Sequence, residues 1–221
     1  MPRFRRTAKV IMVLWAALLA ALPASALSDE ADAADGKPLV VCLLSGCPTY
    51  NSEKSLGEFQ EFLEAGYHVK CMRAFRAADN DLRGLENLDS CDVALVFFKR
   101  MQLQGGQLER FQKYVTSGRP LVAVRTASHA VQTWLEFDRL VLGGNYQGHY
   151  DNTPYEVRAV AQAADHPILQ GVSLGTIPGP LYKNAGHADD IHVLLEGSIP
   201  GHTEPVAWTR EFRGGRLFYT S

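Results

Sequence analysis

Residues 118–130 read GRPLVAVRTASHA, and this stretch decides the fold prediction. Its apolar part, residues 120–125, predicts a strand, a sharp turn follows at Arg125, and a helix is predicted to begin near Ser128. Many α/β enzymes present their nucleophile on such a strand–turn–helix element. The residue at the apex here is Arg125, which stays protonated at any working pH and is therefore no nucleophile.

Apolar strands alternate with amphipathic helices on both sides of this stretch. The pattern predicts an α/β fold with a parallel sheet and right-handed crossovers. After about residue 142 helical periodicity fades, and the short strands predicted there are interpreted as extensions of the same sheet. The predicted strands are 39–44, 67–72, 92–98, 120–125, 155–161, 191–197, 205–210 and 216–221, and the predicted helices are 55–65 and 106–116.

Composition places the chain among ordinary globular proteins. With 221 residues, 46% of them hydrophobic and 21% charged, one domain with a sizeable core is expected. The formal net charge of −2 argues against nucleic acid as a partner, because a polyanion requires a basic face.

The N-terminus has the order of a secretory signal peptide. Arg3, Arg5, Arg6 and Lys9 precede the thirteen-residue apolar run 10–22, and the small residues 24–26 (ASA) follow. We predict a signal peptide over 1–26, a flexible leader over 27–37, and an exported protein that leaves the membrane after cleavage. The alternative is an uncleaved anchor, although the run is short of the roughly 20 residues that span a bilayer.

Four cysteines lie in the first half of the predicted domain. Their spacing matches no zinc motif. Buried free thiols are the favoured interpretation for Cys42 and Cys71, which lie in apolar runs. A Cys42–Cys47 or a Cys71–Cys91 disulfide is the alternative in an oxidising compartment.

The ends of the predicted parallel strands supply the candidate site, because ligands bind there in open α/β sheets. Ser45 follows the first strand, and Lys99 and Arg100 follow the third. The fourth strand leads into Arg125, Thr126, Ser128 and His129. The guanidinium groups of Arg100 and Arg125 favour a carboxylate or phosphate. The alternative for Arg125 is an ion pair with an acidic side chain that locks the turn.

A second candidate is the polar loop at residues 142–153, LGGNYQGHYDNT. Its His149 is suited to act as a general base, a metal ligand or a hydrogen-bond donor, and the alternative is a loop histidine without function. If His129 and His149 converge, they make an acid/base pair or hold a single divalent metal such as zinc.

Seven segments in order carry a resemblance that spans residues 38–221: LLSG, VAVRTASHA, LGGNYQGH, HPIL, LYKNAG, GSIPGHTEPVAWTR and GGRLFYTS. In these segments the chain resembles the ThuA-like (trehalose utilisation) family of the class I glutamine amidotransferase-like superfamily. The resemblance implies a flavodoxin-like, doubly wound, mostly parallel sheet with helices on both faces.

The resemblance also bears on chemistry. The amidotransferase elbow has the form G-x-C-x-G, and residues 123–127 (AVRTA) take its place without the cysteine, so glutaminase activity is not expected. The family implies a role in the metabolism of disaccharides, glycosides or keto-sugars, and some relatives hold a metal through histidines. Family members continue past the last strand into a Gly-His pair, so we expect a domain truncated at its C-terminus.

Two functions remain open. The first is a carbohydrate-active lyase, isomerase or hydrolase in which His129 and His149 are catalytic. The second is a non-catalytic module that binds a sugar or an anion in the same cleft. The residues expected to bind substrate are Ser45, Arg100, Arg125, Thr126, Ser128, Asn145, Tyr182 and Trp208.

Overall fold

The computed structural model describes residues 36–221, of which Pro38–Ser221 form one compact unit. The predicted signal peptide and most of the predicted leader lie outside the described residues. None of the helices in this part of the chain is long and apolar enough to cross a membrane. Two α-helices, α1 (Ser52–Gly66) and α2 (Gly105–Thr116), accompany ten strands: β1 (Leu39–Gly46), β2 (Val69–Ala78), β3 (Asp81–Arg83), β4 (Val93–Phe98), β5 (Leu121–Val124), β6 (Tyr155–Ala159), β7 (Thr176–Ile177), β8 (Ile191–Ile199), β9 (His202–Phe212) and β10 (Gly215–Thr220).

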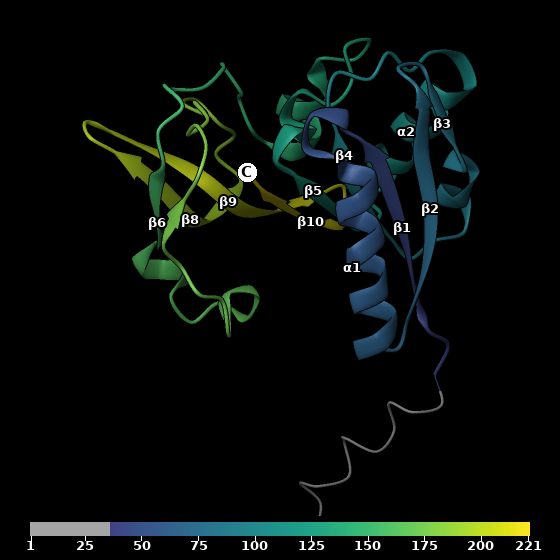
Figure 1. Ribbon diagram of the computed structural model, residues 1–221, viewed down its shortest axis with the longest axis horizontal. Coiled ribbons are helices and arrows are strands. Elements are labelled where there is room, and N and C mark those ends of the chain that lie inside the picture. Colours follow the sequence, from purple (N-terminus) through teal and green to yellow (C-terminus); the bar gives the residue numbers. More distant parts are fainter. Residues whose placement is uncertain (1–35) are drawn as a thin grey trace, which may run out of the picture. The chain divides into compact units, whose positions relative to one another are not determined.

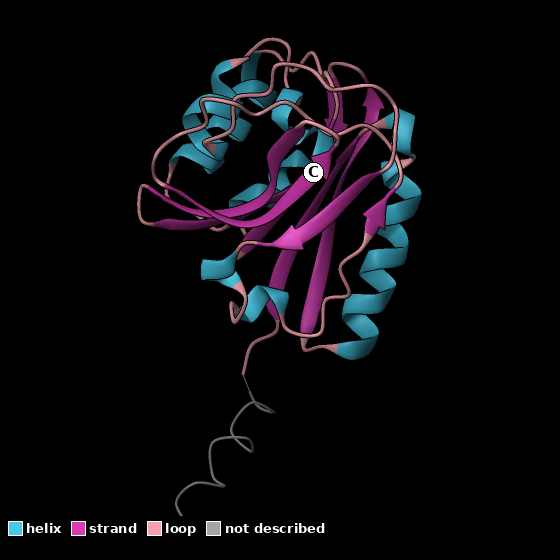
Figure 2. Ribbon diagram, turned by 90° about the vertical axis from the view of Figure 1, so that its left-hand side faces the viewer, coloured by secondary structure: helices cyan, strands magenta, loops and turns pink. Residues whose placement is uncertain are grey.

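All ten strands belong to one sheet with the order β3-β2-β1-β4-β5-β10-β9-β8-β6-β7. The sheet is twisted (Figure 2). The five strands β2-β1-β4-β5-β10 are parallel and form the core of the sheet. Their order is that of flavodoxin-like folds, in which the chain changes direction across the sheet between the first and third strands, here β1 and β4. The predicted doubly wound fold is confirmed.

Antiparallel strands extend this core at both edges. β3 pairs with β2 on one side, and β9, β8, β6 and β7 follow β10 on the other. The segments after residue 142 therefore extend the same sheet, as predicted, and more of the sheet is antiparallel than a mostly parallel description implies.

The two α-helices cover opposite faces of the core (Figure 1). Successive residues of β1 alternate between these faces, which is the period of two expected for a strand. Val41 and Leu43 belong to the apolar cluster that contains Leu56 of α1, whereas Leu44 belongs to the cluster that contains Phe111 of α2. This two-sided burial explains why the sequence of β1 is continuously apolar.

The four cysteines are buried free thiols, as predicted for Cys42 and Cys71. Both alternative disulfides are contradicted, because each would join thiols from opposite faces of the sheet. Cys42 and Cys91 belong to the cluster on the α2 face, whereas Cys47 and Cys71 belong to the cluster on the α1 face.

The prediction that a helix begins near Ser128 is wrong. A five-residue 3₁₀-helix, Arg125–His129, takes its place. The chain then runs beside the segment that follows β4, where the amide of Met101 donates to the carbonyl of Ala130 at 2.7 Å and Met101 forms an isolated parallel bridge with Val131. These backbone pairings bind the segment after His129 to the segment after β4, so the helix does not propagate further.

Candidate functional site

The carboxyl ends of β1, β4 and β5 meet next to the point where the direction of the sheet changes, which is where open α/β sheets form a ligand-binding crevice. Tyr50 follows β1, Arg100 follows β4, and Arg125 and His129 follow β5. The segments after β4 and β5 are bonded to each other, because the amide of Arg100 donates to the carbonyl of His129 at 3.0 Å. The residues at the strand ends are therefore held in a fixed relation by the sheet.

Arg125 occupies the apex of the turn with φ of 43°, a value that side-chain-bearing residues rarely adopt. The hydroxyl of Tyr219 donates to its carbonyl at 2.8 Å and fastens the turn to β10. Its guanidinium lies 4.6 Å from the ring centroid of Tyr182 and 5.5 Å from that of Tyr50, and it donates to the carbonyl of Pro180 at 3.4 Å. Within residues 36–221 no carboxylate pairs with Arg125, so the structure does not support the alternative of a locking ion pair.

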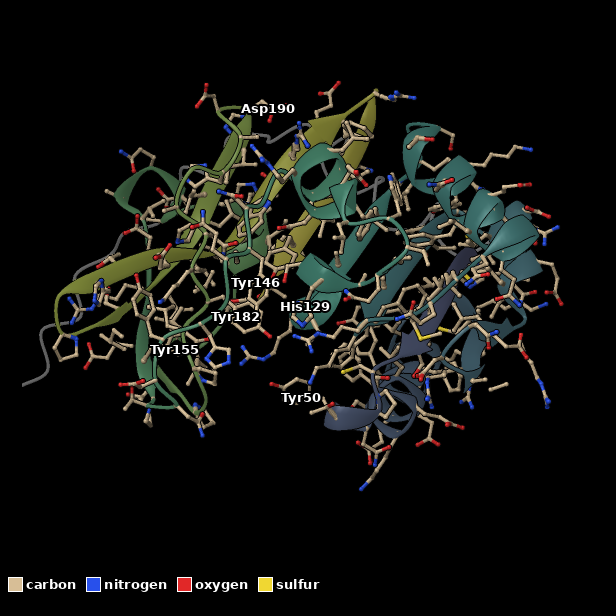
Figure 3. All side chains as sticks on the ribbon, turned by 90° about the horizontal axis from the view of Figure 1, so that it is seen from above. Tyr50, His129, Tyr146, Tyr155, Tyr182 and Asp190 are labelled. Carbon is tan, nitrogen blue, oxygen red and sulfur yellow. The ribbon has the colours of Figure 1, made fainter. Side chains whose placement is uncertain are left out.

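His129 packs among aromatic rings on one wall of the crevice. Its imidazole stacks on Tyr146 with 4.5 Å between centroids and lies 6.0 Å from Tyr182, and Figure 3 shows these three side chains close together. Its Nδ1 is 3.2 Å from the hydroxyl of Ser128. Burial, followed by the charges of Arg100, Lys99 and Arg125, lowers the pKa of His129 to about 4. The imidazole is therefore neutral near pH 7 and has a ring nitrogen free of a proton, although it is a weaker base than an ordinary histidine.

The loop that carries Tyr146 is anchored by Asp138, a residue that sequence reasoning missed. The carboxylate of Asp138 accepts the amide of Tyr146 at 2.7 Å, while its other oxygen, Oδ1, is buried without a hydrogen-bond partner. Burial raises the pKa of Asp138 to about 6. The sequence signal for this contact is the glycine pair: a Cβ on Gly144 would overlap Asp138 Oδ1, and Gly143 has φ of 75°. Asp138 thus positions the loop that carries Tyr146.

A cavity of about 250 Å³ adjoins the stacked rings. His129 and Tyr146 form one side of it, and Asp138, Asn145 and Trp134 line other parts. Polar groups beside an aromatic wall suit a polyhydroxylated ligand, which presents both hydroxyl groups and apolar C–H faces.

His149 lies close to this wall. It forms an isolated antiparallel bridge with Tyr182, and its Nδ1 is 2.7 Å from the carbonyl of Tyr150. After burial and the three cations, the charge of His149 adds a smaller effect that also lowers the pKa of His129. The structure therefore brings the two histidines into the same region.

The predicted site residues divide into two groups. Arg100, Arg125, Ser128, His129, Asn145, His149 and Tyr182 gather at the crevice and the adjoining cavity. Tyr50, which belongs to the same crevice, was missed because it sits in a polar loop with no distinguishing motif.

The remaining three predicted residues are buried in the protein. The hydroxyl of Ser45 is buried and bonded to that of Ser52 at 2.7 Å. Thr126 is fully buried beneath the turn. Trp208 is also fully buried, and its indole N–H donates to the carbonyl of Leu142 at 2.8 Å, so its aromatic surface belongs to the core.

The described residues do not fit a metal centre of the kind held by several protein ligands. No group of three or more His, Cys, Asp or Glu side chains gathers within residues 36–221, whereas zinc sites use three or four such ligands.

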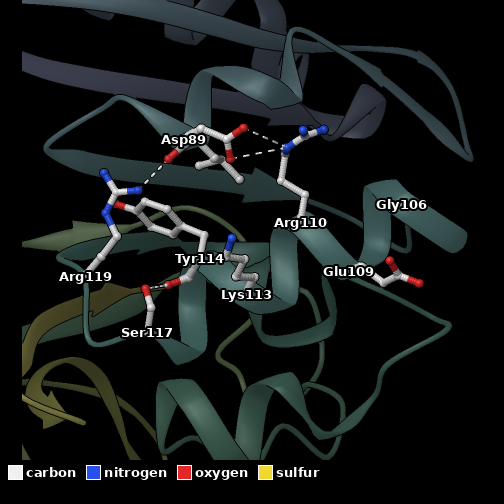
Figure 4. Close-up of a pocket in the computed structure, with 9 residues that line it drawn as sticks. Asp89, Gly106, Glu109, Arg110, Lys113, Tyr114, Ser117 and Arg119 are labelled. Atoms are coloured by element: carbon white, nitrogen blue, oxygen red, sulfur yellow. Dashed lines mark hydrogen bonds and ion pairs between the residues drawn. The ribbon is translucent and has the colours of Figure 1, made fainter.

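A larger cavity of about 620 Å³ lies beside α2, near the amino ends of β4 and β5 (Figure 4). Several of its polar side chains already have partners in the protein. Arg110 pairs with Asp89 at 3.3 Å, and Arg119 donates to the carbonyls of Leu88 and Cys91. Because ligands of open α/β sheets bind at the carboxyl ends of the strands, this cavity is the weaker candidate.

Known proteins match both the sequence and the fold. The family model described as ThuA, trehalose utilisation, matches residues 44–221. A ThuA-like protein from Parabacteroides merdae aligns with a TM-score of 0.64 at 17% identity, covering 83% of this chain and 79% of that one. A second, from Bacteroides uniformis, aligns with a TM-score of 0.60 at 14% identity, covering 83% and 81%.

Part of a glycosidase has a similar fold. A β-galactosidase from Bacillus circulans sp. alkalophilus aligns with a TM-score of 0.52 at 14% identity, over 83% of this chain but 28% of the enzyme. No curated protein matches the sequence. Because the family model covers most of the chain and the structures agree in fold, the protein belongs to the ThuA, or trehalose utilisation, family.

Proposed function

We propose that this protein is exported and acts on a disaccharide, glycoside or keto-sugar derivative bound in the crevice at the carboxyl ends of β1, β4 and β5. Family membership supports a role related to trehalose utilisation. The order of basic, apolar and small residues at the N-terminus supports export.

The observation that carries this proposal is the position of His129. A neutral imidazole stacks on Tyr146 beside a cavity, at the edge of the sheet where α/β folds bind ligands. Its Nδ1 faces the hydroxyl of Ser128, and its Nε2 has no hydrogen-bond partner among the described residues. A ligand hydroxyl, or a C–H group made acidic by an adjacent keto group, is the kind of proton donor that Nε2 would accept from.

Arg125 gives the site a chemistry different from that of amidotransferases. A guanidinium at the apex of the turn orients an oxygen-rich ligand by hydrogen bonds but forms no covalent intermediate. The protein is therefore expected to lack glutaminase activity.

The test combines binding with turnover. The purified protein is mixed with trehalose, glycosides and keto-disaccharides, binding is followed by thermal shift, and products are followed by mass spectrometry. For His129→Gln we expect turnover to fall by about 100-fold or more, the usual contribution of a general base, while the protein remains folded.

The matched control is His192→Gln, at an exposed histidine on β8 outside the crevice, which is expected to keep full turnover. Binding without turnover of any ligand in this panel would instead support a non-catalytic sugar-binding module. No binding by any sugar would contradict the proposal.

A further inference from the structure

Three cationic side chains meet at the crevice. Lys99 and Arg100 follow β4, and Arg125 follows β5. All three lie close enough to His129 for their charges to lower its pKa, after the larger effect of burial. Both arginines have a positive φ, 53° for Arg100 and 43° for Arg125. Such conformations cost free energy and persist where the surrounding structure imposes them, and they often occur at ligand sites.

None of these cations is neutralised by the described part of the protein. The ion pairs of residues 36–221 involve other side chains throughout. Lys99 donates to the hydroxyl of Thr49 at 2.9 Å, and Arg125 donates to a backbone carbonyl and packs against two tyrosine rings. Neutral partners of this kind orient a cation and leave its charge available to a ligand.

The acidic groups that the structure describes near the crevice form no ion pair with these cations. Asp138 lines the adjoining cavity and accepts the amide of Tyr146, and no cation of residues 36–221 pairs with it. Glu204 accepts the hydroxyl of Tyr150 at 2.8 Å and the amide of Asn184 at 2.9 Å. The positive charge of the crevice therefore lacks an internal counter-charge, and arginine pairs of this kind recognise carboxylate and phosphate groups.

We infer that the crevice selects an anionic sugar, whose carboxylate or phosphate lies between Arg100 and Arg125 and whose ring packs against the half-buried ring of Tyr146. This inference rests on the proposed sugar-binding function and names the class of sugar. Tyr146 supplies the sugar contact, because an inorganic anion has no apolar face to stack on its ring. Arg125 is held between Tyr50 and Tyr182, so it would lie where the charged group of the ligand joins the sugar ring.

Isothermal titration calorimetry tests the inference with a matched set of ligands: glucose, glucuronate, glucose 6-phosphate and inorganic phosphate. We expect at least one anionic sugar to bind about tenfold or more tightly than glucose, and its affinity to fall as salt is raised. The two anionic sugars distinguish a carboxylate from a phosphate as the recognised group. Equal affinity for glucose and both anionic sugars would overturn the inference, as would inorganic phosphate binding as tightly as the best sugar.

Variants locate the effect. Arg100→Gln, at an exposed side chain that does not affect the core, is expected to weaken the anionic sugar about tenfold and glucose less than about twofold. Arg125→Lys, which keeps the charge but loses the planar fork, is expected to weaken the anionic sugar as well. Arg83→Gln on the edge strand β3, where the side chain is 84% exposed, is the control and is expected to change neither affinity.

The outcomes separate the inference from the proposed function. If neutral sugars and keto-sugars bind as tightly as the charged ones, and Arg100→Gln affects none of them, the anionic class is wrong while sugar binding stands. If no sugar of either kind binds, the proposed function fails together with the inference.

Discussion

The imidazole of His129 stacks on the ring of Tyr146 with 4.5 Å between their centroids, and this contact joins the turn after β5 to the loop anchored by Asp138. The two titratable groups on either side of Tyr146 are shifted in opposite senses. Burial lowers the pKa of His129 to about 4 and raises the pKa of Asp138 to about 6. Burial therefore favours the neutral form of both groups, which makes the aromatic wall sensitive to pH.

Acid is expected to destabilise the protein through His129. The imidazole is less basic in the folded state than in the unfolded state, where its pKa is near 6.5. Its contribution to stability is therefore complete above pH 6.5 and is lost as pH falls from 6.5 towards 4. At pH 5 the loss amounts to about 2 kcal/mol of the free energy of unfolding.

Urea unfolding at pH 7 and pH 5 measures this effect. His129→Gln removes the titrating group, so the variant is expected to lose about 2 kcal/mol less than the wild type between these pH values. His192→Gln serves as the control and is expected to follow the wild type. An identical pH dependence in wild type and His129→Gln would show that His129 is not protected from protonation in the folded state.

Asp138 is expected to act in the opposite direction over nearly the same pH range. Its pKa in the folded state lies above the unfolded value of 3.8, so its favourable contribution is present below pH 3.8 and is lost as pH rises through 6. Asp138→Asn carries no such penalty. Its free energy of unfolding should rise relative to the wild type by up to about 3 kcal/mol between pH 4 and pH 7. A constant difference between the two proteins across this range would contradict the assignment.

Gly144 is expected to be intolerant of any side chain. A Cβ there would overlap Asp138 Oδ1, so Gly144→Ala must displace either the carboxylate or the loop that carries Tyr146. We expect a loss of about 1–3 kcal/mol in thermal or urea unfolding, the usual cost of overpacking. Gly106→Ala in α2 is the matched control, since its Cβ meets nothing within 4 Å. That control should raise stability by about 0.5–1 kcal/mol through helix propensity. Equal effects of the two substitutions would argue against the close contact at Asp138.

The architecture was predictable because its signals are local. Continuous apolar runs such as β1 and β4 indicate strands buried on both faces, and the spacing of Leu56 and Phe111 with their neighbours indicates the helices that cover them. The carboxyl ends of neighbouring parallel strands lie at the same edge of a sheet, so the residues that follow them are expected to meet. Arg100, Arg125 and His129 do so.

Features that depend on contacts between distant residues were less predictable. The helix expected near Ser128 is replaced because Met101, far away in sequence, pairs with residues 130 and 131. Tryptophan is a residue type that often binds sugars, so Trp208 is a reasonable candidate from the sequence. Only the register of β9 shows that its ring faces the core, where its centroid lies 4.2 Å from that of Tyr219. Asp138 gives no signal in its own segment, because its partner is the amide of Tyr146 in the following loop.

Nuclear magnetic resonance tests most directly whether the ligand binds in the crevice or in the cavity beside α2. Side-chain signals of arginine, histidine and tyrosine are followed while glucuronate or a keto-disaccharide is added. We predict that signals of Arg125, His129 and Tyr182 shift together in a saturable manner, while those of Arg119 and Tyr114 remain unchanged. Saturable shifts at Arg119 and Tyr114, with none at Arg125 and His129, would contradict this prediction.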